Sequence, residues 1–192
     1  MYDSLYDYIS SKVRSSDEEF EQVKEAFTPK KLRKRQYLLQ EGDVCRYAAF
    51  VVKGALRQYL VDEKGNEHIT QFAIEDWWIS DRESMASETP SNYNIDALED
   101  CELLLLTRQN ALDLEKNVPV YKELMDVVKE RSAFAGQKRV VSALSYSAEE
   151  KYKEFINTYP KIVQRVPQHM IASFLGITPE TLSRLRGKST KS

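Results

Sequence analysis

Short hydrophobic segments separated by turn glycines set the strongest limit on what this chain can fold into. Gly42, Gly54 and Gly65 lie 12 and 11 residues apart, and the segments between them are rich in β-branched, leucine and aromatic residues. Short strands at this spacing are typical of a β-sandwich or barrel. The pattern predicts strands at 37–39, 47–52, 56–61 and 68–72, and a second group at 92–98 and 102–106.

Helical patterns flank this β-rich region. Residues 3–27 are predicted to be helical, with Ser16 and Glu19 forming a capping box, and Pro29 ends the segment. After the strands, Thr107 is expected to cap a short helix that ends near Asn117. The β-rich region is therefore expected to carry helices at both ends.

A long helix is predicted at about 120–144. Side chains recur along it at spacings of 3 and 4 residues, which is the pattern of a coiled-coil seam between two chains. The predicted dimer positions are Tyr121, Leu124, Val128, Arg131 and Ala135. The same spacing also fits a helix that packs on its own β-domain. Gly136 is expected to weaken the helix and to mark a bend.

One more helix is predicted at 147–159, and Pro160 is expected to end it. The chain then divides into a β-rich domain at 1–117, a connecting helix at 118–145 and a small helical domain at 146–192. This order of strands followed by helices indicates an α+β fold.

The segment from Gln168 to Leu185 has the spacing of a helix-turn-helix motif. Ala172, at the fifth position, is small enough for two helices to cross closely, and Gly176, at the ninth, tolerates the positive φ of the turn. Apolar residues supply the inward face that fixes the two helices: Ile171, Leu175, Ile177, Leu182 and Leu185.

The second helix of this motif starts strongly and has a polar outer face. Thr178 is predicted to cap it, with Pro179 at its first position and Glu180 at the positive end of the helix dipole. In a major groove, Glu180 can accept from cytosine N4 and Arg184 can bind guanine O6 and N7. The alternative is a surface salt bridge between the two. The predicted DNA contacts, to bases and phosphates, are Gln168, His169, Thr178, Glu180, Thr181, Ser183, Arg184, Arg186 and Lys188.

Charge supports this hypothesis without proving it. The chain has a formal net charge of −2, yet residues 161–192 carry six Lys or Arg against Glu180 alone. A basic end on an acidic body suits a nucleic-acid-binding module, although a solvated tail has the same charge. The terminal Gly-Lys-Ser-Thr is not a phosphate loop, because that loop needs a glycine where Leu182 stands.

Several other classes of protein are disfavoured. The apolar segments fall far short of the roughly 20 residues that span a bilayer, and no secretory signal is seen, so we expect a cytoplasmic protein without membrane contact. Cys45 and Cys101 form neither a metal box nor a disulfide framework. A cupin-type metal enzyme needs clustered histidines, and only His68 and His169 are present, in different predicted domains. We therefore expect no catalytic residues, no bound metal and no cofactor.

From about Leu38 to Lys188 the chain resembles the Crp/Fnr family of bacterial transcription regulators. The resemblance rests on the glycine-punctuated strands, on Gly54 with Leu56-Arg57 and Tyr59, on the segment 62–67, and on Gly-Ile-Thr-Pro-Glu-Thr-Leu-Ser-Arg at 176–184. It implies a β-roll of the cyclic-nucleotide-binding type, jelly-roll-like and acting as a sensor, then a long dimerisation helix and a C-terminal winged helix. It also implies a homodimer on palindromic double-stranded DNA and RNA polymerase as a further partner.

The chain departs from the nucleotide-binding members of that family. Those members carry a Gly-Glu pair and then an Arg-Ser/Thr-Ala step, which by loop position fall near 80–81 and 91–93, and the phosphate-binding arginine is absent here. Cyclic AMP is therefore not the expected effector. The remaining candidates for a ligand pocket are Trp78, Ser80, Asp81, Arg82, Ser91, Asn92 and Tyr93. For Arg82 a surface position, and for the aromatic residues core packing, are the alternatives.

Two further departures concern the sensor and the wing. The oxygen-sensing members hold an iron–sulfur cluster on N-terminal cysteines, and no cysteine precedes Cys45. Few residues follow Arg186, so a reduced wing is expected. The sequence thus predicts a homodimeric, sequence-specific DNA-binding regulator with a recognition helix at 178–186. The alternative is a ligand-binding adaptor that binds protein and no DNA, and the salt dependence of duplex binding separates the two.

Overall fold

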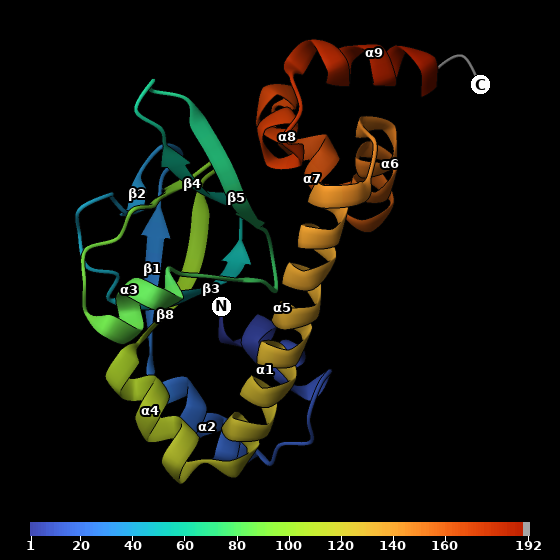
Figure 1. Cartoon of the computed structure of the whole chain (residues 1–192). Coiled ribbons are helices and arrows are strands. Elements are labelled where there is room, and N and C mark those ends of the chain that lie inside the picture. Colours follow the sequence, from blue (N-terminus) through green and yellow to red (C-terminus); the bar gives the residue numbers. More distant parts are fainter. Residues whose placement is uncertain (190–192) are drawn as a thin grey trace.

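Two four-stranded antiparallel sheets form the β-roll that dominates Figure 1. The computed structural model describes residues 1–189, and in it the strand orders are β1-β8-β3-β6 and β2-β7-β4-β5. The strands are β1 (Phe27–Leu32), β2 (Tyr37–Leu39), β3 (Tyr47–Lys53), β4 (Leu56–Val61), β5 (Glu67–Ala73), β6 (Trp78–Ile79), β7 (Asn94–Ala97) and β8 (Cys101–Thr107). The predicted α+β class with a β-roll is confirmed.

The leucine run of β8 explains how the roll is built. Leu103 and Leu105 pack in the core between the two sheets, whereas Leu104 and Leu106 pack in a second core with the flanking helices. Side chains of a strand alternate between its two faces, and here both faces are covered. A strand in this position needs consecutive apolar residues, which is why the sequence shows a run and not an alternation.

The N-terminal helices are shorter than predicted. Helix α1 (Tyr2–Ser10) and helix α2 (Asp17–Glu25) are separated, and the capping box of Ser16 with Glu19 starts α2. The prediction of helix up to residue 27 is wrong, because Phe27 begins β1. Pro29 lies inside β1, where it is tolerated because β1 is an edge strand that pairs only with β8.

The polar stretch 80–91 contains a helix that the sequence analysis missed. Helix α3 (Arg82–Ser87) begins after Asp81, whose carboxylate accepts from the backbone N–H groups of Glu83 and Ser84 at 3.1 Å. Asp81 is therefore an N-cap, which stabilises the helix start.

Two helices lead from the roll to the C-terminal domain. Helix α4 (Arg108–Asn117) has Thr107 as its N-cap, as predicted, and helix α5 (Pro119–Ser145) follows directly. Figure 1 shows α5 running from the base of the roll to the C-terminal helices. Gly136, which was expected to weaken the helix, does not interrupt it: α5 is continuous through that residue.

Four short helices complete the described chain. They are α6 (Ala148–Thr158), α7 (Pro160–Arg165), α8 (Gln168–Leu175) and α9 (Pro179–Ser189). Ser147 caps α6 through a capping box with Glu150. Pro160 ends α6 as predicted, but it also begins α7, which was not predicted, because proline is favoured at a first helical position.

Gly54 lies at a close approach between two turns of the roll. Its φ is +101°, and a Cβ atom there would meet Cys101 Sγ at 2.6 Å and the carbonyl oxygen of Asp100 at 2.8 Å. Gly65 has a similar φ of +82°, but nothing lies within 4 Å of its Cβ position. The two glycines therefore separate the cost of backbone conformation from the cost of a steric clash.

We expect Gly54→Ala to destabilise the protein clearly more than Gly65→Ala. The positive φ costs about 1–2 kcal/mol in both variants, and the clash adds about 1–3 kcal/mol in Gly54→Ala alone. Urea unfolding of the two variants and the wild type measures both losses. Equal losses would mean that the backbone at Asp100 gives way at no cost.

Candidate nucleic-acid interface

Helices α8 and α9 form the predicted helix-turn-helix. Gly176 ends α8 in the left-handed region with φ +66°, and Ile177 donates its N–H to the carbonyl of Ala172 at 3.0 Å. Ala172 is 0% exposed and Leu182 is 1% exposed, so the crossing of the two helices is closely packed. Ala172 therefore allows the close helix crossing, and Gly176 the left-handed turn, that their spacing predicted.

Thr178 caps α9. Its Oγ1 accepts from the N–H of Thr181 at 3.2 Å and donates to Thr181 Oγ1 at 3.1 Å. Pro179 holds the first helical position, where no N–H is needed. The start of α9 is thus stabilised by Thr178 and Pro179, which are both exposed.

The outer face of α9 carries the polar side chains that were predicted to bind DNA. Glu180, Ser183, Arg184 and Arg186 are exposed, and Thr181 is half-buried. Arg184 Nη2 donates to Thr181 Oγ1 at 3.2 Å. In the described part of the chain no ion pair joins Arg184 to Glu180. The side chain of Lys188, and the region where a wing would follow α9, lie outside what the structure describes.

The carboxylate of Glu180 stays ionised well below neutral pH. Its own backbone N–H, the hydroxyl of Thr178 and the charge of Arg184 together lower its pKa. At the start of α8, His169 is exposed, while Gln168 is half-buried and its Oε1 is without a hydrogen-bond partner among the described residues. The acceptor and the donor that base contact requires are therefore both present on α9.

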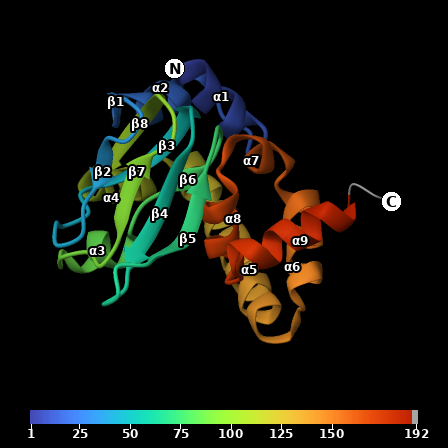
Figure 2. The same ribbon diagram turned by 90° about the horizontal axis from the view of Figure 1, so that it is seen from above.

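Helix α8 also packs against the edge of the β-roll, a contact that the sequence did not reveal. Figure 2 shows α8 beside β5. Ser173 Oγ donates to the carbonyl of Glu67 at 2.7 Å and accepts from the N–H of Ile69 at 3.1 Å. The rings of Phe72 and Phe174 lie 5.3 Å apart. One apolar cluster spans both domains, so the helix-turn-helix and the roll share a core.

Arg165 forms the polar part of the same interface. It lies at the end of α7 and bonds two carboxylates of the roll, with Nη1–Glu75 Oε2 at 2.6 Å and Nη2–Glu99 Oε2 at 2.7 Å. Burial disfavours ionised Glu75, but Arg165 and backbone N–H donors outweigh it and lower the pKa of Glu75 to about 2. Arg165, one of the six cations at 161–192, therefore joins the two domains.

The candidate ligand residues are not all brought together. Ser91 Oγ donates to Asp81 Oδ2 at 2.7 Å, and both residues are buried. Asn92 is exposed and Tyr93 is half-buried. Trp78 packs on Phe50 and donates from Nε1 to the Tyr8 hydroxyl at 3.2 Å.

The buried arginine of the roll is also fully engaged. Arg57 binds Asp96 with Nε–Oδ1 at 2.8 Å, and it also bonds Glu67. Burial opposes its charge, but these two carboxylates outweigh that effect and raise the pKa of Arg57. A buried arginine neutralised in this way is not available to an added anion.

A cavity of 720 Å³ lies between the roll, α5 and the C-terminal domain. Of the candidates, Trp78, Ser80 and Arg82 line it, and Asp81, Ser91, Asn92 and Tyr93 do not. Nothing in the sequence pattern links Lys12 to this site, and the spacing of Arg131 predicts a dimer seam. Both also line the cavity, and no local pattern could bring residues of α5 and of the segment after α1 together.

Three of the five predicted dimer positions pack against their own chain, and the other two are exposed at the edge of the cavity. Tyr121 and Leu124 are 2% and 1% exposed in the core of the roll, and Val128 packs against that core. Arg131 and Ala135 line the cavity. This corrects the face of α5 on which a partner could pack. Large apolar side chains are exposed elsewhere on it: Phe134 (56%), Val140 (59%), Val141 (49%) and Leu144 (84%).

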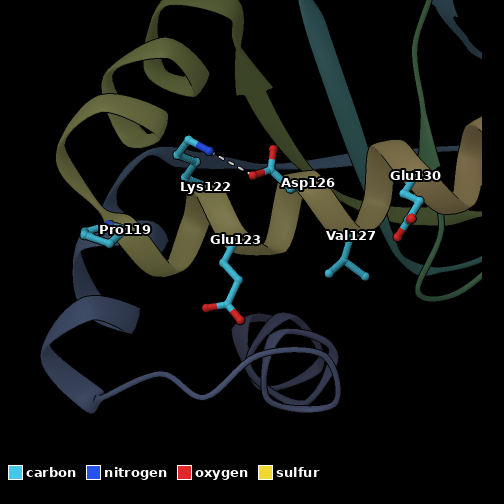
Figure 3. A pocket seen from close by; sticks show the side chains of 6 residues that line it. All are labelled: Pro119, Lys122, Glu123, Asp126, Val127 and Glu130. Atoms are coloured by element: carbon cyan, nitrogen blue, oxygen red, sulfur yellow. Dashed lines mark hydrogen bonds and ion pairs between the residues drawn. The ribbon is translucent and has the colours of Figure 1, made fainter.

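A shallow groove follows the outer face of the first half of α5. Figure 3 shows its side chains along the helix, with the Lys122–Asp126 ion pair of 2.9 Å at one end. Glu123 and Glu130 give it an acidic character, and Val127 lies between them along the helix. The groove is therefore unsuited to an anion.

Residues 1–189 show neither a metal-binding cluster nor a membrane-spanning helix. No group of three or more His, Cys, Asp or Glu side chains there is placed to hold a metal ion. Cys45 and Cys101 are both buried, and burial raises the pKa of Cys101 to about 11. None of the helices in this range has the length and apolar content to cross a bilayer.

Comparison with known families and sequences gives consistent matches. The family model for the cyclic nucleotide-binding domain matches residues 29–117. The fumarate and nitrate reduction regulatory protein of Vibrio cholerae is 24% identical over 189 residues, which cover 92% of this chain and 75% of that protein. The Escherichia coli protein of the same name is 25% identical with the same coverage.

Solved structures share the fold. FixK2 from Bradyrhizobium japonicum superposes with a TM-score of 0.72 at 20% identity, covering 86% of this chain and 85% of FixK2. A putative transcriptional regulator of the Crp/Fnr family from Eubacterium rectale gives 0.66 at 14% identity, covering 92% and 85%. At these identities the likeness concerns the fold alone.

We expect Arg165→Gln to weaken the contact between the two domains in a pH-dependent way. The lowered pKa of Glu75 means that its ion pair stabilises the folded state fully above its ordinary pKa of 4.5 and loses that effect as the pH falls toward 2. At pH 7 the variant should lose about 1–2 kcal/mol of unfolding free energy.

Urea unfolding at pH 7, 4 and 3 measures this difference. The gap between wild type and Arg165→Gln should narrow steadily below pH 4.5. Arg14→Gln is the matched control, since Arg14 is exposed and its loss should change stability little at any pH. A gap that stays constant across the series would contradict the assigned ion pair.

Proposed function

Because the chain is a member of the Crp/Fnr family, we propose that it is a transcription regulator that binds specific DNA sequences as a homodimer. The observation that carries the proposal is α9, a capped helix with Leu182 packed inward and a donor and an acceptor on its exposed face. A helix of this kind fits the major groove of B-DNA.

On this proposal, base recognition is divided among few residues. Glu180 and Arg184 contact base edges, and Thr181 positions the guanidinium through its hydrogen bond. Arg186, Lys188, Ser183 and Thr178, with Gln168 and His169 on α8, contact the DNA backbone. Pro179 has neither a backbone N–H nor a polar side chain, so the first position of the helix donates no hydrogen bond to DNA.

The proposed dimer uses the exposed apolar side of α5. Val127, Phe134 and Val141 are seven residues apart, and Leu144 follows at the next seam position, which gives a heptad pattern on one face. Unpartnered apolar side chains of this size favour association with a second helix. Two copies joined here would present two copies of α9 to a palindromic site, with RNA polymerase as a further partner in the cytoplasm.

The sensor domain is proposed not to bind a cyclic nucleotide. The N–H groups at the start of α3, which suit a phosphate, already bond the carboxylate of Asp81. Ser91 is held by the same carboxylate, and Arg57 is neutralised by Asp96 and Glu67. A cyclic phosphate would meet a buried negative charge at this place, and the buried arginine of the roll is already neutralised.

Arg184→Ala should relax sequence preference at one base pair of each half-site. The wild type is first used to select duplexes from a random pool, and binding is then measured by fluorescence anisotropy at several salt concentrations. We expect steep loss of affinity with salt and, for the variant, a loss of about 1–3 kcal/mol confined to one position.

The matched control for this experiment is Arg46→Ala, an exposed arginine of the loop before β3, which should bind as the wild type does. Uniform weakening on all sequences would assign Arg184 to the backbone. Failure to enrich any palindromic site would support the adaptor hypothesis instead.

Phe134→Asp should convert the dimer to a monomer, because a carboxylate would be buried without a partner in the apolar seam. Sedimentation equilibrium measures the association constant. Val61→Asp places the same charge on another exposed apolar residue, 39% exposed at the end of β4, and should remain dimeric. A monomeric wild type would remove the proposed seam.

A further inference from the structure

The cavity between the roll, α5 and the C-terminal domain has an excess of positive charge. Among the described residues that line it, Asp76 is the one carboxylate, and four side chains are cationic. These cations are Lys12, Arg82, Arg131 and Arg139. They come from the segment after α1, from the start of α3 and from α5, so they meet only in the folded chain.

Most of this charge is not neutralised within the described chain. Lys12, Arg82 and Arg131 make no ion pair with a carboxylate there. Lys12 Nζ lies 3.8 Å from the centre of the Tyr8 ring. Burial and the nearby charge of Arg131 lower the pKa of Lys12, and Asp76 offsets only part of that effect. An added anion would relieve this repulsion.

Arg139 marks the other end of the same cavity. Its guanidinium donates to the carbonyl of Thr70 and lies 4.4 Å from the centre of the Phe174 ring. This arginine is therefore engaged. The charge left for a ligand lies mainly at Lys12, which is half-buried, and at Arg131, which is exposed, and Arg82 is a further exposed cation of the lining.

The rest of the lining is rich in aromatic side chains. It includes Phe72, Trp77, Trp78, Phe155, Tyr159 and Phe174. Flat apolar walls beside a cationic site favour a ligand with an aromatic body and a negatively charged end. The volume of 720 Å³ is within the range of small-molecule sites.

We propose that this cavity binds an aromatic carboxylate, with its carboxylate between Lys12 and Arg131 and its ring against the tryptophans. The proposal rests on the sensor role proposed above for the roll, but ligand binding needs no DNA. The polar contacts lie at the boundary with α5 and not at the start of α3, where a cyclic phosphate would be held. Phe155, Tyr159 and Phe174 belong to the C-terminal domain, so a bound ligand contacts both domains.

Trp77 and Trp78 are the only tryptophans of the chain, and both line the cavity, so their emission reports on it directly. The full chain is titrated with 4-phenylbutyrate and with its uncharged analogue 4-phenylbutanamide, with excitation at a wavelength that neither compound absorbs. We expect a saturable change with the carboxylate and at least about tenfold weaker binding of the amide.

Arg131→Gln and Lys12→Gln should each weaken 4-phenylbutyrate about tenfold and leave 4-phenylbutanamide nearly unchanged. Lys138→Gln is the control, because Lys138 is an exposed cation of α5 outside the cavity lining and should bind as the wild type does. Circular dichroism of every variant establishes that it is folded.

Equal binding of the amide and the carboxylate would overturn the proposal, as would unchanged affinity in both cavity variants. Absence of a saturable change in the wild type up to tens of millimolar carboxylate would overturn it as well. Cyclic AMP is tested in parallel, and tighter binding of cyclic AMP that Arg131→Gln does not affect would place the anion site elsewhere. None of these outcomes depends on whether the chain binds DNA.

Discussion

The free edge of β5 is the feature on which the arrangement of this molecule depends. β5 is the last strand of its sheet, so its outer backbone groups lack a strand partner. Ser173 of α8 bonds two of these groups, the N–H of Ile69 and the carbonyl of Glu67. A helix thus covers the edge and fixes the C-terminal domain on the roll. The Arg165 ion pairs and the interdomain cavity both require this placement, since each has one side in either domain.

Helix α5 changes its surroundings along its length. Near its start, Tyr121 and Leu124 complete the core of the roll. Further on, the same face leaves the roll, and Arg131 and Arg139 line the cavity. A neighbouring face of the helix keeps large apolar side chains such as Phe134 in solvent. The proposed dimer seam would use this face, which the chain's own roll leaves uncovered.

Features with a local cause could be predicted from the sequence, and those with a long-range cause could not. The caps at Ser16, Thr107 and Thr178 and the turn at Gly176 depend on a few neighbouring residues, so their patterns sufficed. Apolar residues recur every 3 or 4 positions both in a helix that packs on a partner chain and in one that packs on its own sheet. The spacing therefore could not show that Tyr121 and Leu124 pack on the roll and not on a second chain. The start of β1 was missed because a proline such as Pro29 occurs both after the end of a helix and within an edge strand.

Charges inside the roll are paired, whereas most cations at its boundary with α5 have no carboxylate partner among the described residues. Inside the roll, each buried charge has a partner of this chain: Arg57 with Asp96 and Glu67, and Asp81 with Ser91. At the boundary with α5 the cations outnumber the carboxylates. The same cavity is also lined by Phe174 of the C-terminal domain, at its Arg139 end. The ligand proposed for this cavity would contact the roll and the C-terminal domain at once. A ligand that binds the docked arrangement of the two domains more tightly than an undocked one would stabilise docking directly, without a conformational change inside the roll.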